Sequence, residues 1–225
     1  MKRALVLGGG GPVGIAWHHG LVIGLREEGI ELRDADIIVG TSAGSLVGTR
    51  LADGQDLAEP APGGQRLGLP LADNGMDTEK VMEIFKLWNE ALDVEQMDVA
   101  RRQAIGRLAC EARACSPEVW IAATGGSTGV PDWPSAPSCD LRIVGIDVSR
   151  GERVLFDHES GVPLHKAIAA SCSVPGMFPP VEIDGTYYID GGVGTGTSAE
   201  YADRGGEEST PEVVLAIAPM CTRTI

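Results

Sequence analysis

An apolar run that ends in a Gly-x-Ser-x-Gly turn constrains the fold of this chain more than any other feature. Ile37-Ile38-Val39 leads directly into Gly40-Thr41-Ser42-Ala43-Gly44, and Ser45-Leu46-Val47-Gly48-Thr49-Arg50-Leu51 follows. This order predicts a strand, a sharp turn with Ser42 at its apex, and a helix. The flanking glycines leave room for the crowded backbone of such a turn, and the helix N-terminus favours negative charge beside the serine. The pattern therefore predicts a nucleophilic hydroxyl; the alternative is an ordinary helix-start serine with packing glycines.

The same five-residue pattern occurs a second time, with Ser127 at its centre. Residues 119–123 before it have the composition of a strand, but the segment after it contains Pro131, Pro134 and Pro137. Proline lacks a backbone donor and restricts the residue before it, so a helix is not expected there. We therefore expect Ser127 to lie in a flexible loop, with Trp133 exposed among the prolines, and Ser42 to be the nucleophile.

A glycine-rich segment follows the first apolar run of the chain. Ala4-Leu5-Val6-Leu7 predicts a short strand, Gly8 to Gly11 follow, and a helix is expected from about Ile15 to Glu28. Consecutive glycines allow several backbone N–H groups to point into one concavity that binds an anion. In an acyl-transfer enzyme, that anion is the oxyanion of the tetrahedral intermediate.

The glycine-rich segment also satisfies the dinucleotide-binding fingerprint, through Gly9, Gly11 and Gly14. That interpretation requires an acidic residue at the end of the second strand. Asp34 and Asp36 instead precede that strand. A non-catalytic nucleotide-binding module is therefore the weaker alternative, and we expect no cofactor.

A serine nucleophile needs a base, and histidine is the usual one. The chain contains four histidines, namely His18, His19, His158 and His165. The first two lie in the first predicted helix, where a structural role is the default expectation. In the common hydrolase order the histidine follows the acid, so Asp140 or Asp147 with His158 or His165 remains a possible triad.

Asp190 is the better candidate for the base. It closes the predicted strand 185–189, and Gly191-Gly192 follow it, which leaves the backbone beside its carboxylate open. A carboxylate is a weak base in water, with a reference pKa near ~3.9, so the site would have to hold it close to Ser42 in a partly desolvated pocket.

Taken in order, these motifs resemble the patatin-like phospholipases and esterases. The family pattern is a glycine-rich loop, a Gly-x-Ser-x-Gly elbow and a distant Asp-Gly-Gly, which are found here at 8–14, 40–44 and 190–192. The segment 170–180 also resembles the family's approach to its aspartate. The resemblance spans roughly residues 4–195, and three ordered motifs are far more specific than one.

The resemblance implies a Ser42–Asp190 dyad without histidine and an oxyanion hole formed by the amides of Gly9, Gly10 and Gly11. The motif glycines in supporting roles would be Gly14, Gly40, Gly44, Gly191 and Gly192. The implied substrates are fatty-acyl esters or phospholipids, so the implied activity is that of a phospholipase A, a lysophospholipase or a carboxylesterase. The family needs no metal for catalysis.

Two features depart from the family pattern. Val13 stands where the family usually has Arg or Lys in its glycine loop. The chain also stops soon after the predicted strand 213–217, where relatives continue into at least one more helix. We therefore expect either a truncated chain or a last sheet face that something else covers.

The order of the predicted elements is strand, helix, strand, helix, then helices, then strands. It predicts an α/β fold, a three-layer α/β/α sandwich of the patatin type with a central, mostly parallel sheet. A chain of 225 residues with 43% hydrophobic content can bury one sizeable core, so we expect a single domain over 1–225.

An insertion of different character is expected at about 53–139. Residues 53–75 predict a loop and 77–114 are expected to be helical. An apolar stripe along these helices is expected to pack in the core; it consists of Val81, Ile84, Phe85, Trp88 and Leu92. Residues 141–148 and 152–156 predict a hairpin around Ser149-Arg150-Gly151.

Charge and cysteine content narrow the expected partners and location. A net charge of −14 argues against nucleic acid and against anionic membrane surfaces as partners. Any contact with a membrane surface is therefore expected to be apolar, local and transient. Five cysteines, an odd number without a paired framework, predict reduced thiols in a cytoplasmic protein that is at most peripheral at membranes. No apolar run approaches the ~20 residues of a membrane span.

Overall fold

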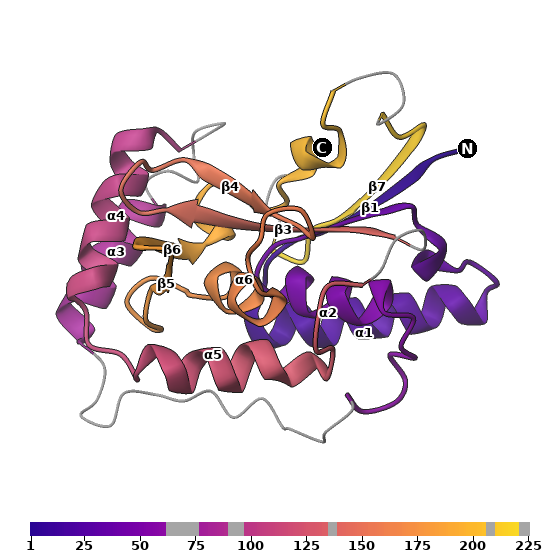
Figure 1. Cartoon of the computed structure of the whole chain (residues 1–225), viewed down its shortest axis with the longest axis horizontal. Coiled ribbons are helices and arrows are strands. Elements are labelled where there is room, and N and C mark those ends of the chain that lie inside the picture. Colours follow the sequence, from indigo (N-terminus) through magenta and orange to yellow (C-terminus); the bar gives the residue numbers. More distant parts are fainter. Residues whose placement is uncertain (62–76, 90–96, 135–138, 206–209, 221–225) are drawn as a thin grey trace.

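The computed structural model describes residues 1–61, 77–89, 97–134, 139–205 and 210–220, and these residues form an α/β sandwich around one sheet (Figure 1). The described strands form a seven-stranded sheet in the order β5-β6-β3-β2-β1-β7, with β4 also paired to β3. The parallel strands are β1 (Arg3–Leu7), β2 (Ile37–Gly40), β3 (Asp140–Asp147) and β7 (Val213–Ile217). The antiparallel additions are β4 (Arg153–Phe156), β5 (Val181–Ile183) and β6 (Thr186–Asp190).

The segments Ala4–Leu7 of β1 and Ile37–Val39 of β2 are buried on both faces, which explains why they are wholly apolar. Leu5, Leu7 and Ile38 belong to the core on one face of the sheet, whereas Val6 and Val39 belong to a separate cluster on the other face. The predicted strands 4–7, 37–39 and 213–217 and the hairpin over 141–156 are confirmed.

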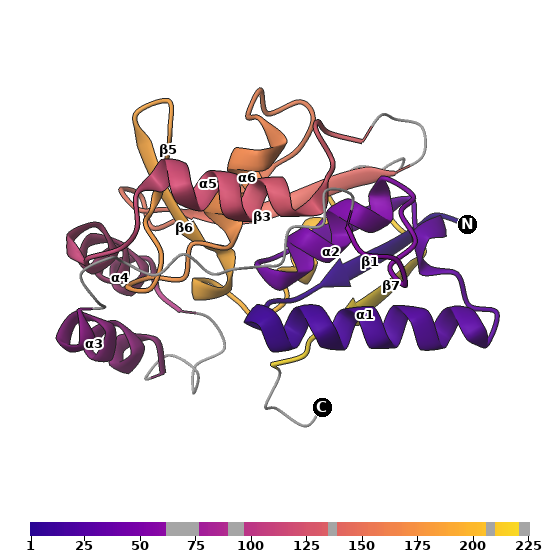
Figure 2. The same cartoon turned by 90° about the horizontal axis from the view of Figure 1, so that it is seen from below.

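Helices cover both faces of the sheet, so the predicted three-layer architecture is confirmed. One layer consists of α1 (Gly11–Glu27), α2 (Ala43–Ala52), α5 (Pro117–Gly125) and α6 (Leu164–Ser171), which lie in front of the sheet in Figure 2. On the other face, α3 (Thr78–Asn89) and α4 (Val99–Glu111) cover β3 and β6. The short 3₁₀-helix Ala199–Ala202 covers β1 and β2.

The apolar stripe of the insertion packs in the core at Ile84 and Trp88, whereas Val81 and Phe85 are only half-buried. Ile84 of α3 is fully buried and clusters with Ile146 of β3 and Ile189 of β6. Phe85 stacks on Trp88 with their ring centroids 6.0 Å apart. Leu92 and residues 62–75 of the predicted loop lie outside the described residues.

Helix α1 begins earlier than the predicted Ile15. Gly10 precedes the helix at φ 154° and Pro12 lies in its first turn. The fixed φ of proline suits the first turn of a helix, whose N–H groups have no partner in any case. The glycine-rich segment therefore runs directly into the helix N-terminus.

The predicted strand at 119–123 is wrong, because these residues lie in helix α5. Ser116 caps this helix by accepting a hydrogen bond from the Val119 amide, and Pro117 occupies its first turn. A Ser-Pro-Glu sequence is a helix-start signal that outweighs the strand propensity of the residues after it. The expected exposure of Trp133 is also wrong: its ring is half-buried, and its indole N–H donates to the Val162 carbonyl at 2.7 Å.

Strand β7 is an edge of the sheet and pairs with β1 alone among the described strands. Val213, Val214 and Leu215 are each more than 40% exposed. None of the helices in the described part of the chain has both the length and the apolar character needed to cross a bilayer.

Candidate active site

Ser42 lies at the apex of the turn between β2 and α2, with φ 52° and ψ −119°. A serine rarely adopts this conformation, and such strain persists only where the surroundings enforce it. The glycines of the motif permit this conformation because the neighbouring chain lies too close to them for a Cβ. A Cβ on Gly40 would lie 2.6 Å from the Ser45 Cα, and a Cβ on Gly44 would lie 1.9 Å from the Leu7 carbonyl oxygen.

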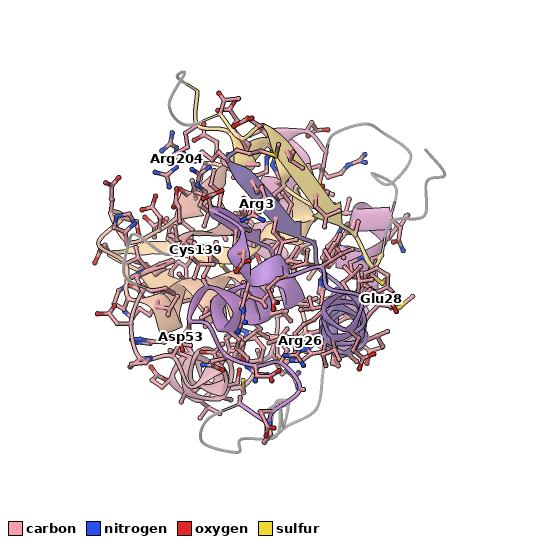
Figure 3. The ribbon with its side chains drawn as sticks, turned by 90° about the vertical axis from the view of Figure 1, so that its right-hand side faces the viewer. Arg3, Arg26, Glu28, Asp53, Cys139 and Arg204 are labelled. Atoms are coloured by element: carbon pink, nitrogen blue, oxygen red, sulfur yellow. The ribbon has the colours of Figure 1, made fainter. Side chains whose placement is uncertain are left out.

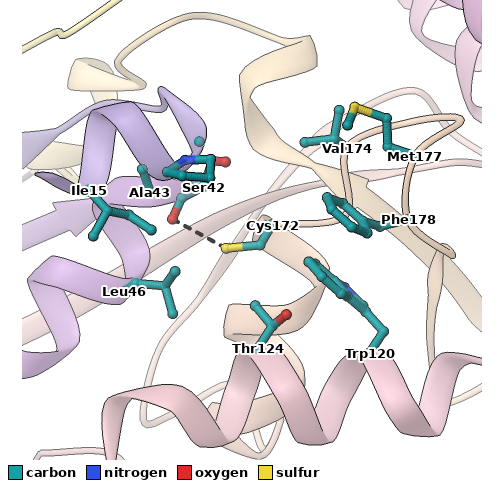
Figure 4. A pocket seen from close by; sticks show the side chains of 12 residues that line it. Ile15, Ser42, Ala43, Leu46, Trp120, Thr124, Cys172, Val174, Met177 and Phe178 are labelled. Atoms are coloured by element: carbon teal, nitrogen blue, oxygen red, sulfur yellow. Dashed lines mark hydrogen bonds between the residues drawn. The ribbon is translucent and has the colours of Figure 1, made fainter. Parts of the chain in front are cut away.

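The end of helix α6 holds this elbow in place. The Ser42 amide donates to Ser171 Oγ at 3.0 Å, and Ser171 Oγ donates to the Val144 carbonyl at 2.7 Å. The Ser42 carbonyl accepts from Ser45 Oγ at 2.7 Å and from Cys172 Sγ at 3.3 Å (Figure 4). Sequence reasoning assigned no role to Ser171 or Cys172; their only signal was that they lie in the segment 170–180.

Asp190 lies at the end of β6, and strand β3 brings it to Ser42. Strand β3 lies between β2 and β6, with Gly40 opposite Ile143 and Asp190 opposite Gly145. Ser42, two residues beyond Gly40, is therefore level with Asp190 across β3. Gly191 allows this approach, because a Cβ there would lie 2.4 Å from the Val144 carbonyl oxygen.

The Asp190 carboxyl is buried and is held by one backbone donor. Its side chain accepts from the Gly192 amide at 2.7 Å, and its own amide donates to the Ser173 carbonyl at 3.0 Å. Burial raises the pKa of Asp190 from 3.8 to about 6, while interactions with the Ser42 side chain and the Gly192 amide lower it. The carboxyl is thus a stronger base than an exposed aspartate and is mostly ionised at neutral pH.

The glycine loop passes directly beside Ser42. The nearest side-chain atom to a Cβ on Gly9 would be the Ser42 Cβ, at 3.5 Å. The Gly9 amide, however, donates to the Gly196 carbonyl at 3.3 Å. The amides of Gly10 and Gly11 donate to no acceptor in the part of the chain that the structure describes. Two of the three predicted oxyanion donors are therefore unengaged.

Helix α1 then packs closely against α2. A Cβ on Gly14 would lie 3.3 Å from the Ala43 Cβ. Because Ala43 directly follows the serine, this contact keeps the glycine loop beside the elbow.

An apolar cavity opens beside Ser42. Its volume is about 260 Å³, and Figure 4 shows Ser42 at one side and stacked aromatic rings at the other. Trp120 and Phe178 stack with their centroids 3.9 Å apart. The cavity is lined by Gly11, Pro12, Ile15, Ser42, Ala43, Leu46, Trp120, Thr124, Cys172, Val174, Met177 and Phe178. Such a lining suits a hydrocarbon chain.

The histidine alternatives do not reach this site. His158 is half exposed, and its Nε2 lies 3.9 Å from a carboxylate oxygen of Glu159. His165 is exposed on the first turn of α6. None of the contacts described for either residue involves Ser42 or Asp190.

The two acids proposed for that triad are engaged in structural interactions. Asp140 pairs with Arg142 at 2.7 Å. Asp147 accepts from the amides of Ser149 and Arg150 in the hairpin turn.

The second serine motif has a structural explanation. Ser127 is 7% exposed in a 3₁₀-turn after α5, and its hydroxyl donates to the Thr124 carbonyl at 2.7 Å. A Cβ on Gly125 would lie 2.2 Å from the His165 carbonyl oxygen, so that glycine lets α5 pack against α6. The predicted flexible loop is therefore wrong for Ser127, although the preference for Ser42 over Ser127 is unaffected.

The acids of the nucleotide alternative lie away from the glycine loop. The Asp36 carboxyl accepts from the Arg3 amide at 2.7 Å. Arg3 starts β1 on the side of the molecule that faces the viewer in Figure 3, where Asp53, the residue after α2, also lies. Ser42 and the glycine loop lie at the other end of these strands. The described residues contain no cluster of His, Cys, Asp or Glu that could hold a metal ion.

The chain is similar to a known protein family and to several individual proteins. A family model described as patatin-like phospholipase matches residues 5–109 and 134–203. An uncharacterized NTE family protein of Mycobacterium tuberculosis is 29% identical over 195 residues, which cover 85% of this chain and 43% of that protein. Lysophospholipase nte1 of Aspergillus fumigatus is 30% identical over 190 residues, which cover 84% of this chain and 10% of that protein.

Among solved structures, VipD from Legionella pneumophila matches with a TM-score of 0.47 and 16% identity, covering 85% of this chain and 46% of VipD. The chain spans less than half the length of each of these relatives.

Proposed function

This chain belongs to the patatin-like phospholipase family, and we propose that it hydrolyses fatty-acyl esters through an acyl-enzyme on Ser42 with Asp190 as the base. One observation carries the proposal: a strained elbow serine lies beside a buried carboxyl whose pKa is raised to about 6, at the side of an apolar cavity. Perturbed pKa values of this kind are typical of functional sites.

The proposed reaction has two steps. Ionised Asp190 accepts the Ser42 proton as Ser42 Oγ attacks the ester carbonyl, and the amides of Gly10 and Gly11 stabilise the oxyanion. The alcohol leaves with the proton from Asp190, and the acyl group remains on Ser42. Asp190 then takes a proton from water, which attacks the acyl-enzyme, and Ser42 recovers its proton as the fatty acid is released.

The cavity defines the proposed substrate class. A lining without a charged side chain suits an acyl chain, whereas the alcohol part of the ester would remain outside. Phospholipids, lysophospholipids and simple carboxylic esters all carry such an acyl chain. The name of the fungal relative, lysophospholipase, supports a lipid among them.

A lipid surface could deliver such a substrate through the start of α1. Val13 is 75% exposed and Trp17 is 47% exposed, while the adjacent Pro12 lines the cavity. Residues 4–25 contain no Asp, Glu, Lys or Arg. We propose a transient, peripheral contact with uncharged lipid at this surface.

The thiols of Cys110, Cys139 and Cys172 are not in disulfides, which supports the proposed cytoplasmic location.

The test compares the two serine motifs. We expect Ser42→Ala to abolish hydrolysis of a short p-nitrophenyl ester and covalent labelling by a fluorophosphonate. Ser127→Ala is the matched control, because it changes the same residue type in the same pattern without touching the cavity. It should keep activity within about threefold and should still be labelled at Ser42. Peptide mapping that places the label on another serine, or turnover retained by purified Ser42→Ala, would overturn the proposal.

A further inference from the structure

A buried histidine that plays no part in the proposed proton transfers lies behind the glycine loop. His18 lies on the inner face of α1, between Gly14 and Val22, and is 0% exposed. Its Nε2 lies 2.9 Å from the Gly8 carbonyl oxygen. A carbonyl only accepts hydrogen bonds, so Nε2 must carry the proton and donate it.

The other ring nitrogen, Nδ1, indicates that the Nε2–H group is the reason for a histidine at this position. Nδ1 of His18 is buried and has no hydrogen-bond partner among the described residues. Burial lowers the pKa of His18, so the ring is neutral and carries a single proton. A leucine would fill such a place without leaving a polar atom unpaired. Among the described residues, the side chain of His18 therefore makes one hydrogen bond, the bond to the Gly8 carbonyl.

That bond fixes one peptide plane of the glycine loop. Gly8 presents its carbonyl to His18, and the amide of the same peptide, that of Gly9, donates to Gly196 on the other side. One residue further, the Gly10 carbonyl accepts from the Gly14 amide at 2.8 Å. Glycines have no side chains to restrict them, so these bonds hold the loop in one conformation.

We propose that His18 is a positioning residue that orients the oxyanion loop, defined here as Gly8–Gly11, through its bond to the Gly8 carbonyl. Loss of this bond leaves the Gly8–Gly9 peptide held by the Gly9–Gly196 bond alone, so the peptide can tilt about that bond and displace the unengaged amides of Gly10 and Gly11. The inference rests on the proposed function for its effect on catalysis, but its effect on the loop is independent of it.

The first measurement needs no turnover. We expect His18→Leu to speed amide hydrogen exchange in the peptide that contains Gly8–Gly11, because the loop loses an anchor. His18→Gln should restore protection, since its side-chain amide can donate to the same carbonyl. Val22→Ala is the matched control: it removes buried atoms one turn along the same helix face and should leave the loop unchanged. Equal exchange in wild type and His18→Leu would overturn the inference, whether or not the protein proves to be an esterase.

The second measurement separates positioning from packing. A displaced oxyanion donor weakens transition-state binding alone, so His18→Leu should lower kcat by about 10–100-fold with KM within about twofold. His18→Gln should recover most of this loss, and Val22→Ala should lower Tm without lowering kcat. Unchanged kcat in His18→Leu, with an active wild type, would overturn the inference.

Two further results distinguish failure of the proposed function from failure of the inference about His18. An inactive and unlabelled wild type would remove the proposed function, while hydrogen exchange would still decide the role of His18 in the loop. If His18→Leu does not fold, His18→Asn takes its place. The shorter asparagine places its amide one bond further from Gly8 than glutamine does. Equal loop protection in the Gln and Asn variants would then count against the proposal.

Discussion

At the scale of single residues, the Asp190 carboxyl has two opposing environments. Burial disfavours its charge, whereas the Gly192 amide and the Ser42 side chain favour it. Burial dominates, so the pKa of Asp190 is raised to about 6. A base with a pKa near the working pH accepts a proton more readily than one near 4. The environment of the residue, and not its type, raises the pKa of its carboxyl.

The raised pKa predicts the pH dependence of activity. Protonated Asp190 cannot accept the Ser42 proton. The logarithm of kcat/KM should therefore fall with a slope of one per pH unit as the pH drops below about 6. Hydrolysis of a soluble ester between pH 4.5 and 8 measures this, at about ten values of pH. A profile that stays flat down to about pH 5 would contradict the assignment of Asp190 as the base.

The Asp190→Asn variant is a second test of Asp190 as the base. It should lose nearly as much activity as Ser42→Ala, because either change removes the same step. Its stability should change in the opposite direction. The folded pKa of Asp190 lies above the unfolded one, so ionised Asp190 destabilises the fold above pH 6. The neutral amide should therefore raise Tm at pH 8. Asp147→Asn, which alters a buried turn acid, should lower Tm and keep activity.

At the scale of elements, the elbow is a contact between three segments. Strand β1 approaches the first turn of α2 so closely that only glycine fits at position 44. The end of α6 supplies Ser171 and Cys172, which bond the amide and the carbonyl of Ser42. The strain at Ser42 therefore depends on β1 and α6 as much as on its own turn.

We predict that Gly44→Ala destabilises the fold by about 3 kcal/mol or more, because its Cβ would overlap the Leu7 carbonyl. Gly20→Ala provides the control, because a Cβ there meets nothing within 4 Å on the surface of α1. That change should stabilise by about 0.5–1 kcal/mol through helix propensity. Urea unfolding of both variants measures the difference. The prediction is wrong if Gly44→Ala stays within about 0.5 kcal/mol of wild type.

At the scale of the whole molecule, charge is unevenly distributed. The chain has a net charge of −14, yet residues 4–25, which hold the glycine loop and most of α1, contain no charged side chain other than histidine. Part of the cavity lining belongs to this uncharged segment, namely Gly11, Pro12 and Ile15. The lipid contact proposed above would therefore bring no charged side chain of residues 4–25 to the lipid surface.

We predict that Val13→Glu lowers hydrolysis of phosphatidylcholine vesicles by about tenfold, because a charge replaces an exposed apolar contact. Turnover of a soluble short-chain ester should stay within about twofold, since Val13 does not line the cavity. Ile30→Glu is the matched control, because Ile30 is 51% exposed and lies beyond the other end of α1. Equal losses in the two variants, or losses on the soluble ester as well, would count against the lipid-facing surface.

Much of the local structure could be predicted from the sequence alone. Short patterns of glycine, proline and apolar residues control backbone dihedrals within a few residues, so the strand before Ser42, the helix after it and the hairpin over 141–156 were all predictable. The same locality explains the failure at 119–123, where Ser116-Pro117 started a helix that a window on the apolar residues missed.

The sequence by itself determined the candidate residues, namely an apex serine, a glycine loop and an aspartate at the end of a strand. Only the tertiary structure decided how they meet. The register of β2 and β6 on β3 sets Ser42 level with Asp190, and burial sets the pKa of that carboxyl. The contact with the Gly196 carbonyl engages the Gly9 amide, whereas those of Gly10 and Gly11 meet no acceptor among the described residues. Backbone conformation is encoded over a few neighbouring residues, whereas desolvation and distance depend on how remote segments pack.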